Sequence, residues 1–155
     1  MYAVTHYADV NVMGTAILLE AIAARTRPLD MLVVASSRSI YGEGCYHCPT
    51  HGDVFPEART AARMSQGYFE PRCPLCGCEL QAKETREDGR LAPNSVYAAT
   101  KLSQENLVLT MAAALGISAY ALRYQNVFGA GQSLSNPYTG ILSIFSREIL
   151  ARRPI

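Results

Sequence analysis

Apolar residues recur along the chain in two patterns, and each pattern predicts a different kind of element. A helical spacing near the start is formed by Val10, Met13, Ile17 and Ala21. It predicts a helix over residues 8–24, which Pro28 closes. The continuous apolar run MLVVA at residues 31–35 is typical of a short strand buried on both faces. The polar residues 36–42 that follow are then expected at the carboxyl edge of a parallel sheet, where α/β folds bind ligands.

The same order of elements returns further along the chain. A second helix is predicted between Asn94 and Leu115, with Gly116 as a natural stop. Residues 117–122 form another candidate buried strand, and a third helix is predicted over residues 140–151. Helix, strand, insertion, helix, strand and helix is the order expected of a doubly wound α/β sheet.

Two predicted strands are few for a complete sheet of this class, which normally has five or more. The glycine-rich turn that binds dinucleotide phosphates is also not found, because the glycine pairs at 42/44 and 129/131 do not lie between a strand and a helix in the required way. We therefore expect the 155 residues to be part of a longer protein and to be inactive by themselves. The alternative is a complete small domain.

Residues 44–90 interrupt the α/β pattern, which leaves 1–43 and 91–155 as the two parts of one sheet domain. The insertion contains all five cysteines of the chain, Cys45, Cys48, Cys73, Cys76 and Cys78. Four of them form two CxxC pairs, and such pairs bind a tetrahedral zinc ion through thiolates at about 2.3 Å. The predicted ligands are Cys45, Cys48, Cys73 and Cys76.

The prediction of zinc leaves three alternatives open. Cys78 or His51 could replace one of the four ligands, or the thiols could be unligated or partly paired in disulfides. Four protein ligands leave no open coordination position, so the zinc is expected to be structural and not catalytic. The insertion lies between a strand and the next helix of the sheet domain, and we expect it to shape or cover the rim of the ligand site.

Composition and charge exclude several classes of function. Hydrophobic residues make up 49% and charged residues 17%, as in globular proteins, and the formal net charge is +1. This balance gives no support for binding nucleic acid or a membrane surface. Residues 12–24, interrupted by Gly14 and Glu20, resemble a core helix and not a signal peptide or membrane span. Paired cysteines without an export signal favour a cytoplasmic protein.

A candidate catalytic pair lies at the start of the second predicted helix. Tyr97 and Lys101 are four residues apart, so both side chains project from one face. A nearby ammonium group favours ionisation of a phenol, whose ordinary pKa is near 10, and the pair could then act in acid/base catalysis. The spacing alone also fits a packed tyrosine beside a solvated lysine. Ser37, at the end of one predicted strand, and the polar residues 123–126, at the end of the next, favour the catalytic interpretation.

Three ordered segments, ASSRSIYGEG at 35–44, SVYAATK at 95–101 and LRYQNVFGAGQ at 122–132, resemble the extended short-chain dehydrogenase/reductases. The resemblance is to their NAD-dependent nucleotide-sugar epimerase/dehydratase family, and residues 11–15 look like that family's N-x-x-G-T helix. It implies a Rossmann-like sheet, bound NAD with NADP not excluded, a nucleotide-sugar substrate and a homodimer packed through the first helix and the Tyr97 helix.

The resemblance also implies a role for each matching residue. Tyr97 is expected to be the acid/base, Lys101 to lower its pKa and hold the nicotinamide ribose, and Ser37 to hydrogen-bond the reacting sugar hydroxyl. Expected binding residues are Gln125 near the nicotinamide, Asn126 at the substrate diphosphate and Tyr41 in the sugar pocket, where packing is an equal alternative for Tyr41. Asn11 is expected to order the helices and not to bind a ligand.

The reaction favoured by the resemblance is epimerisation at C4 through a transient 4-keto sugar. The dehydratase branch carries Thr-Asp-Glu where this chain has Ser37, Arg38 and Ser39. Neither Arg38 nor Ser39 can replace the carboxylates that act as acid and base in the elimination of water. Residues 132–140 and the insertion look most like bacterial dTDP-L-rhamnose 4-epimerases. The alternatives are a nucleotide-sugar dehydrogenase, reductase or decarboxylase of the same family, and a non-catalytic relative.

Overall fold

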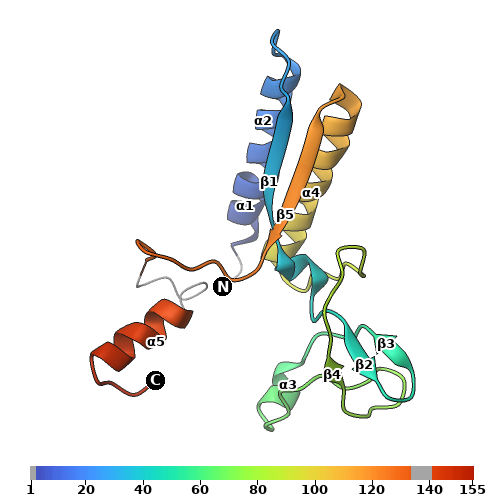
Figure 1. Ribbon diagram of the computed structural model, residues 1–155, viewed down its shortest axis with the longest axis vertical. Coiled ribbons are helices and arrows are strands. Elements are labelled where there is room, and N and C mark those ends of the chain that lie inside the picture. The colour runs from blue at the N-terminus through green and yellow to red at the C-terminus, as the bar shows by residue number, and fades with distance from the viewer. Residues whose placement is uncertain (1–2, 134–140) are drawn as a thin grey trace. The chain divides into compact units, whose positions relative to one another are not determined.

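The computed structural model describes residues 3–133 and 141–155, in two compact units (Figure 1). The units are Met1–Arg123 and Tyr124–Ile155, and each is described by itself. Within the described residues, no helix combines the length and apolar character needed to cross a membrane.

The first unit begins with one continuous helical segment over residues 4–23. It consists of α1 (Val4–Tyr7), η1 (Ala8–Met13) and α2 (Gly14–Ala23), and the middle part is a turn of π-helix. The sequence prediction of a helix here is confirmed, although the helix begins four residues earlier than predicted. A π-turn inside an α-helix is uncommon and is frequently found at functional sites.

Two neighbouring strands form the sheet of this unit. β1 (Met31–Ser37) lies beside β5 (Ser118–Tyr124), and both run in the same direction (Figure 1). The helix α4 (Val96–Leu115) connects them, so the three elements form a β-α-β unit, as expected of a parallel sheet. The side chain of Ser95 caps α4 by accepting a hydrogen bond from the backbone N–H of Ala98 at 3.1 Å.

The helices cover one face of the sheet. Leu19 of α2, Val34 of β1 and Val108 of α4 form the buried core between them. On β1, Met31 and Val33 are 52% and 50% exposed. The prediction that this strand is buried on both faces is therefore wrong for the described residues, because α2 and α4 pack against only one of its two faces and alternate side chains point to opposite faces.

The insertion forms a separate small scaffold between β1 and α4. A short 3₁₀ turn, η2 (Arg38–Tyr41), leads into it from β1. Its antiparallel sheet has the strand order β3-β2-β4, where β2 is Tyr46–Cys48, β3 is Gly52–Val54 and β4 is Gln81–Ala82. A single helical turn, α3 (Ala61–Met64), completes it.

The core of the insertion differs in kind from that of the sheet. Its central cluster of buried residues is Cys48, Val54 and Cys73, with Tyr46, Cys78 and Leu80 packed against them. So small a set of buried side chains is a weak hydrophobic core by itself, as is common in domains that need a metal ion or disulfides to fold.

The second unit contains one helix among its described residues, α5 (Ile141–Leu150). It confirms the third predicted helix to within one residue at each end. The segment 132–140, which carries part of the resemblance, lies mostly outside the described residues.

Candidate active site and cysteine cluster

Ser37 is the last residue of β1, at the carboxyl edge of the sheet, where the sequence predicts it. Its Oγ accepts hydrogen bonds from the backbone N–H of Ser39 at 3.2 Å and from the Ser39 hydroxyl at 2.9 Å. These bonds fix the η2 turn. They also leave the Ser37 hydroxyl proton available for donation to another acceptor.

Tyr97 and Lys101 lie in the first turns of α4, which begins at the sheet end where β1 terminates (Figure 1). The phenol of Tyr97 is 39% exposed, and the ring of Tyr7 meets it edge to face, with centroids 5.9 Å apart. Lys101 is partly buried, and this burial lowers the pKa of its ammonium group. The structure thus brings the three predicted catalytic residues to one end of the sheet.

Lys101 is held by a chain of hydrogen bonds between two helices. Its Nζ donates to Oε1 of Gln104 at 2.5 Å, and Nε2 of Gln104 donates to the hydroxyl of Thr15 at 2.8 Å. The Thr15 hydroxyl donates in turn to the backbone carbonyl of Asn11 at 2.7 Å. This series of hydrogen bonds links Lys101 to α2 and to the π-turn.

The Asn11 side chain makes a second link between the same helices. Its Nδ2 donates to the hydroxyl of Thr100 at 3.0 Å, and that hydroxyl donates to the backbone carbonyl of Tyr97 at 3.0 Å. The ordering role expected for Asn11 agrees with these contacts. Gln104 was not identified from the sequence, although its position three residues after Lys101 places it on the same helix face, which is a usable signal.

Tyr41 contacts an ion pair, and its place in the sugar pocket stays a prediction. Its hydroxyl accepts a hydrogen bond from Nη1 of Arg123 at 2.5 Å, and the guanidinium carbon lies 5.0 Å from the ring centroid. Nη2 of Arg123 lies 2.7 Å from Oε1 of Glu105, whose side chain is 3% exposed. Burial opposes ionisation of Glu105, but hydrogen bonds from Arg123 and its charge outweigh burial and keep the pKa of the carboxyl below its ordinary value.

Gln125 and Asn126 follow β5 directly and belong to the second unit. Both side chains are exposed, in a stretch without regular secondary structure. Their assignment to the nicotinamide and the substrate diphosphate stays a prediction.

Four of the five cysteines form one cluster. The thiol sulfurs of Cys48, Cys73, Cys76 and Cys78 all lie within 4.8 Å of one another. Cys48 lies 3.8 Å from Cys76 and 3.5 Å from Cys78, and Cys76 lies 3.3 Å from Cys78. These separations approach the ~3.8 Å edge of a tetrahedron of sulfurs at about 2.3 Å from zinc.

The composition of the cluster corrects one detail of the sequence prediction. Cys45 was expected as a ligand and Cys78 as a spare, but Cys78 lies in the cluster and Cys45 outside it. The reason is local: the backbone of Cys45 is fixed at the base of the insertion by Thr85, and its thiol lies near the carbonyl of Tyr46. The turn after Cys73 instead brings Cys76 and Cys78 back together.

His51 lies beside the cluster and favours ionised thiols. Its Nδ1 is 3.5 Å from the sulfur of Cys48 and 3.7 Å from that of Cys73. Burial opposes ionisation of Cys48, but hydrogen bonds from His51 and the amides of Thr50 and His51 lower the pKa of the thiol to about 5. Next to the sulfurs of Cys76 and Cys48, the pKa of the Cys78 thiol is raised to about 12. An array in which neighbouring thiols compete to ionise is suited to a divalent cation.

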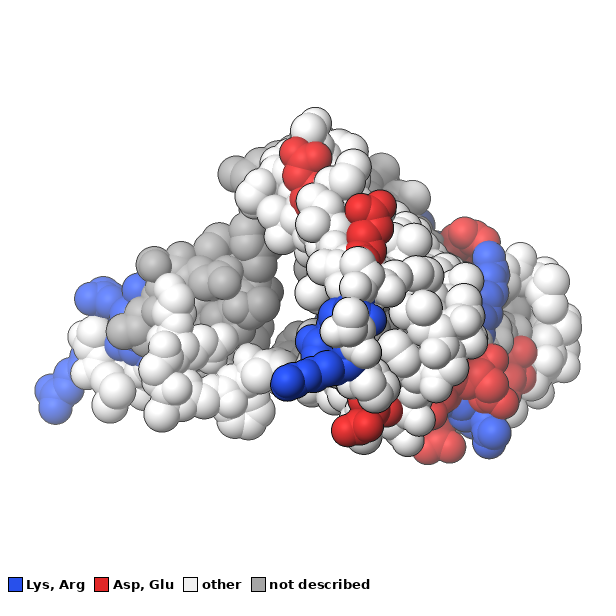
Figure 2. All heavy atoms as spheres, turned by 90° about the horizontal axis from the view of Figure 1, so that it is seen from above, with Lys and Arg blue, Asp and Glu red and all other residues white. Residues whose placement is uncertain are grey.

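Charged groups of both signs are interspersed on the face drawn in Figure 2.

Comparisons with known proteins extend these observations. The model of the family described as "NAD dependent epimerase/dehydratase family" matches residues 75–155. The chain is 37% identical over 144 residues to the dTDP-L-rhamnose 4-epimerase of Burkholderia thailandensis, covering 92% of this chain and 38% of the relative. The chain therefore spans less than half the length of this relative.

Solved structures show the same fold. The UDP-N-acetylglucosamine 4-epimerase of Methanobrevibacter ruminantium is similar with a TM-score of 0.63 and 23% identity, over 96% of this chain and 36% of that one. The UDP-glucose 4-epimerase of Thermus thermophilus, solved with NAD, gives a TM-score of 0.61 at 23% identity, over 96% and 36% of the two chains. The α/β, Rossmann-like fold class predicted from the sequence is confirmed.

Proposed function

This chain belongs to the NAD-dependent epimerase/dehydratase family, and we propose that the whole protein epimerises a nucleotide sugar at C4. The observation that supports the proposal is that Ser37 ends β1 while Tyr97 and Lys101 lie in the first turns of α4, at the same end of one β-α-β unit. The similarity to a dTDP-L-rhamnose 4-epimerase over most of the chain supports a deoxyhexose on a thymidine nucleotide as the substrate.

The residues of the site suit a nicotinamide cofactor. Among the described residues, Gln104 is the one hydrogen-bond acceptor of the Lys101 ammonium, so two of its three N–H donors remain for the hydroxyls of a ribose. Lys101 would hold the ribose of the bound cofactor, whose nicotinamide would supply reversible hydride chemistry at C4 of the sugar. Because no net redox change results, the cofactor would not be consumed. NADP is the alternative, since the chain carries no residue that distinguishes the two.

Tyr97 would remove the proton of the C4 hydroxyl and later return it. Lys101 lies one turn further along the same face of α4, where its ammonium group can serve the same site. Ser37 would donate its hydroxyl proton to the sugar oxygen as that oxygen becomes a carbonyl, because its own oxygen is already an acceptor for Ser39. Arg38 and Ser39 cannot act as the acid and base of a dehydration, which favours epimerisation over loss of water.

The cysteine cluster would hold a structural zinc ion through Cys48, Cys73, Cys76 and Cys78. Four sulfur ligands complete a tetrahedral coordination sphere and leave no position for substrate. We expect the metal to stabilise the insertion, which shapes the rim of the sugar site. His51 could replace one sulfur, and either set would leave Cys45 unligated.

We also propose a homodimer and a cytoplasmic location. The first helical segment exposes Val10, Met13 and Ile17 by 57–60% each, an apolar surface suited to a second copy of the chain. Nucleotide sugars and reduced cysteines are both found in the cytoplasm, which supports that location.

The test is an assay of the whole protein, purified without added cofactor and incubated with dTDP-L-rhamnose, UDP-glucose or UDP-galactose. Proton NMR would follow the sugars, and absorbance at 340 nm would follow net reduction of added NAD. We expect the C4 epimer to form without a change in absorbance. A stoichiometric rise at 340 nm would instead assign a dehydrogenase, and absence of turnover with every sugar would favour a non-catalytic relative.

A further inference from the structure

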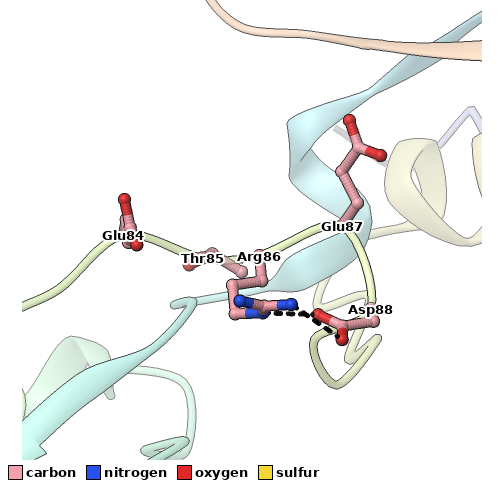
Figure 3. Close-up of a pocket in the computed structure, with 5 residues that line it drawn as sticks. All are labelled: Glu84, Thr85, Arg86, Glu87 and Asp88. Carbon is pink, nitrogen blue, oxygen red and sulfur yellow. Dashed lines mark hydrogen bonds and ion pairs between the residues drawn. The ribbon is translucent and has the colours of Figure 1, made fainter.

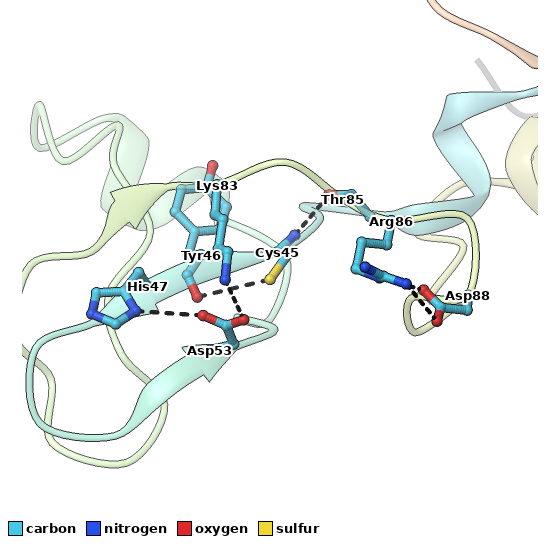
Figure 4. A network of polar contacts seen from close by, with 8 residues as sticks. All are labelled: Cys45, Tyr46, His47, Asp53, Lys83, Thr85, Arg86 and Asp88. Carbon is cyan, nitrogen blue, oxygen red and sulfur yellow. Dashed lines mark hydrogen bonds and ion pairs between the residues drawn. The ribbon is translucent and has the colours of Figure 1, made fainter.

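The insertion is connected to the sheet domain by two adjacent segments of the chain, one outgoing and one returning, which together form a narrow neck. Two hydrogen bonds join these segments. The Ala92 N–H donates to the Ile40 carbonyl at 2.9 Å. The Cys45 N–H donates to the Thr85 hydroxyl at 2.9 Å (Figure 4). Gly42 is required there: its φ is +65°, and a Cβ would lie 2.4 Å from the carbonyl oxygen of Ala92.

One side chain of the sheet domain reaches this neck. Nη1 of Arg123, near the end of β5, donates to the backbone carbonyl of Glu87 at 2.7 Å and also to the Tyr41 hydroxyl. Its Nε and Nη2 donate to the carboxylate of Glu105 on α4. Four of the five guanidinium N–H donors are therefore engaged, toward three different segments of the chain.

These three segments carry the parts of the candidate site. Glu105 lies one turn after Lys101 on the catalytic helix, Tyr41 lies four residues after Ser37, and Glu87 lies on the returning segment of the insertion. The Arg123 side chain is 21% exposed and Glu105 is 3% exposed, so their charge-assisted bonds are largely shielded from water. The guanidinium makes these four hydrogen bonds from a planar fork with five donors, whereas a lysine ammonium has three donors at one point.

The geometry points to Arg123 as a positioning residue that fixes the returning segment 84–91, and with it the rim of the sugar site, to the catalytic helix. The inference rests on the proposed function only where it concerns the sugar. Its structural part, the fixation of residues 84–91 by Arg123, stands on the contacts alone.

The returning segment supplies a matched control. Arg86 also makes an ion pair, to Asp88 at 3.0 Å, but both side chains are more than 70% exposed and belong to the same loop (Figure 3). The surface hollow there is lined by Glu84, Thr85, Arg86, Glu87 and Asp88. Its three carboxylates outnumber its one arginine, so it is unsuited to a diphosphate and is no substrate site.

The experiment compares the whole protein with its Arg123→Lys, Glu105→Gln and Arg86→Lys variants. Hydrogen exchange of the amides in 84–91 and the separate values of kcat and KM are measured. For Arg123→Lys and Glu105→Gln we expect exchange in this segment to become about tenfold faster, because charge-assisted bonds are lost. We expect KM for the nucleotide sugar to rise about tenfold, with kcat changed by less than about threefold. Arg86→Lys is expected to change neither.

The other possible results distinguish the role of Arg123 from the proposed function. Unchanged exchange in both variants would overturn the role of Arg123, whatever the activity. A uniform loss of protection over the whole sheet domain would overturn it too, because that describes a general fold contribution. If Arg123→Lys does not fold, Glu105→Gln, which keeps the side-chain shape, decides alone. Fast exchange in 84–91 together with no turnover by the parent protein would uphold the fixation and reject the proposed function.

Discussion

The α/β layer and the cysteine-rich insertion are built from the same chain but are stabilised differently. In the α/β layer, Leu19, Val34 and Val108 bury aliphatic side chains between two helices and a sheet. In the insertion, two of the three buried core residues are the cysteines Cys48 and Cys73. The first region can therefore fold by hydrophobic burial, whereas we propose that the second depends on a metal ion bound by its thiols. The chemistry assigned to the two regions differs in the same way, with acid/base groups in the layer and metal ligands in the insertion.

The largest expected effect on the insertion is the loss of zinc when a cysteine of the cluster is replaced. Cys48→Ala is expected to abolish zinc binding, because its sulfur is close to those of Cys76 and Cys78. Cys45→Ala is the control and should keep one zinc per chain, since its sulfur lies outside the cluster. Metal content measured by mass spectrometry distinguishes the two. Equal loss of zinc in both variants would restore the ligand set that includes Cys45.

A second substitution should affect the other region alone. Tyr97→Phe removes the acid/base hydroxyl and is expected to lower kcat by about 10²- to 10⁴-fold. Its zinc content and melting temperature should stay unchanged, because Tyr97 is 39% exposed and touches no cysteine. The same sugar assay by NMR measures it. Near-normal turnover by this variant would show that another group carries the proton.

The aliphatic core gives a third, smaller effect. Leu19→Ala should lower the free energy of unfolding of the α/β layer by about 2–5 kcal/mol through lost burial and a cavity. Zinc affinity of the insertion should not change, because Leu19 belongs to the other core. Urea unfolding and a zinc competition titration test both statements. A parallel fall in zinc affinity would mean that the two cores form one cooperative unit.

The smallest expected effect concerns Gln104. Burial already lowers the pKa of Lys101, so its ammonium loses the proton at a lower pH than usual. Gln104→Leu removes an acceptor that stabilises the ammonium form and should lower this pKa further. Activity needs the charged lysine, so the alkaline limb of the kcat profile should move to lower pH. An alkaline limb that stays in place would remove Gln104 from the site.

The sequence predicted the layer better than the insertion, for physical reasons. Helical and strand periodicity is a local property, and it located the helices and strands of the layer to within a few residues. Burial of a strand face depends on what packs against it, so Met31 and Val33 were wrongly expected to be covered. Gln104 was missed although its spacing from Lys101 was a usable local signal; only its second bond, to Thr15, joins residues that lie far apart in the chain.

The insertion shows why the spacing of cysteines predicts the members of a thiol cluster only in part. Two CxxC pairs correctly indicated a thiol cluster, but the choice of the fourth sulfur depended on the turn at Cys76–Cys78 and on the bond that fixes Cys45 to Thr85. Arg123 gave no local signal either. Its partners, Tyr41, Glu87 and Glu105, are brought together only by the folded chain.

The most direct test of the contrast is hydrogen exchange of the whole protein before and after zinc is removed with a chelator. Amides of β2, β3 and the turn at Cys73–Cys78 should lose protection, while those of β1 and α4 keep theirs, because only the insertion depends on the metal. Loss of protection in both regions together, or in neither, would contradict the account that a hydrophobic layer carries a separately stabilised, metal-held insertion.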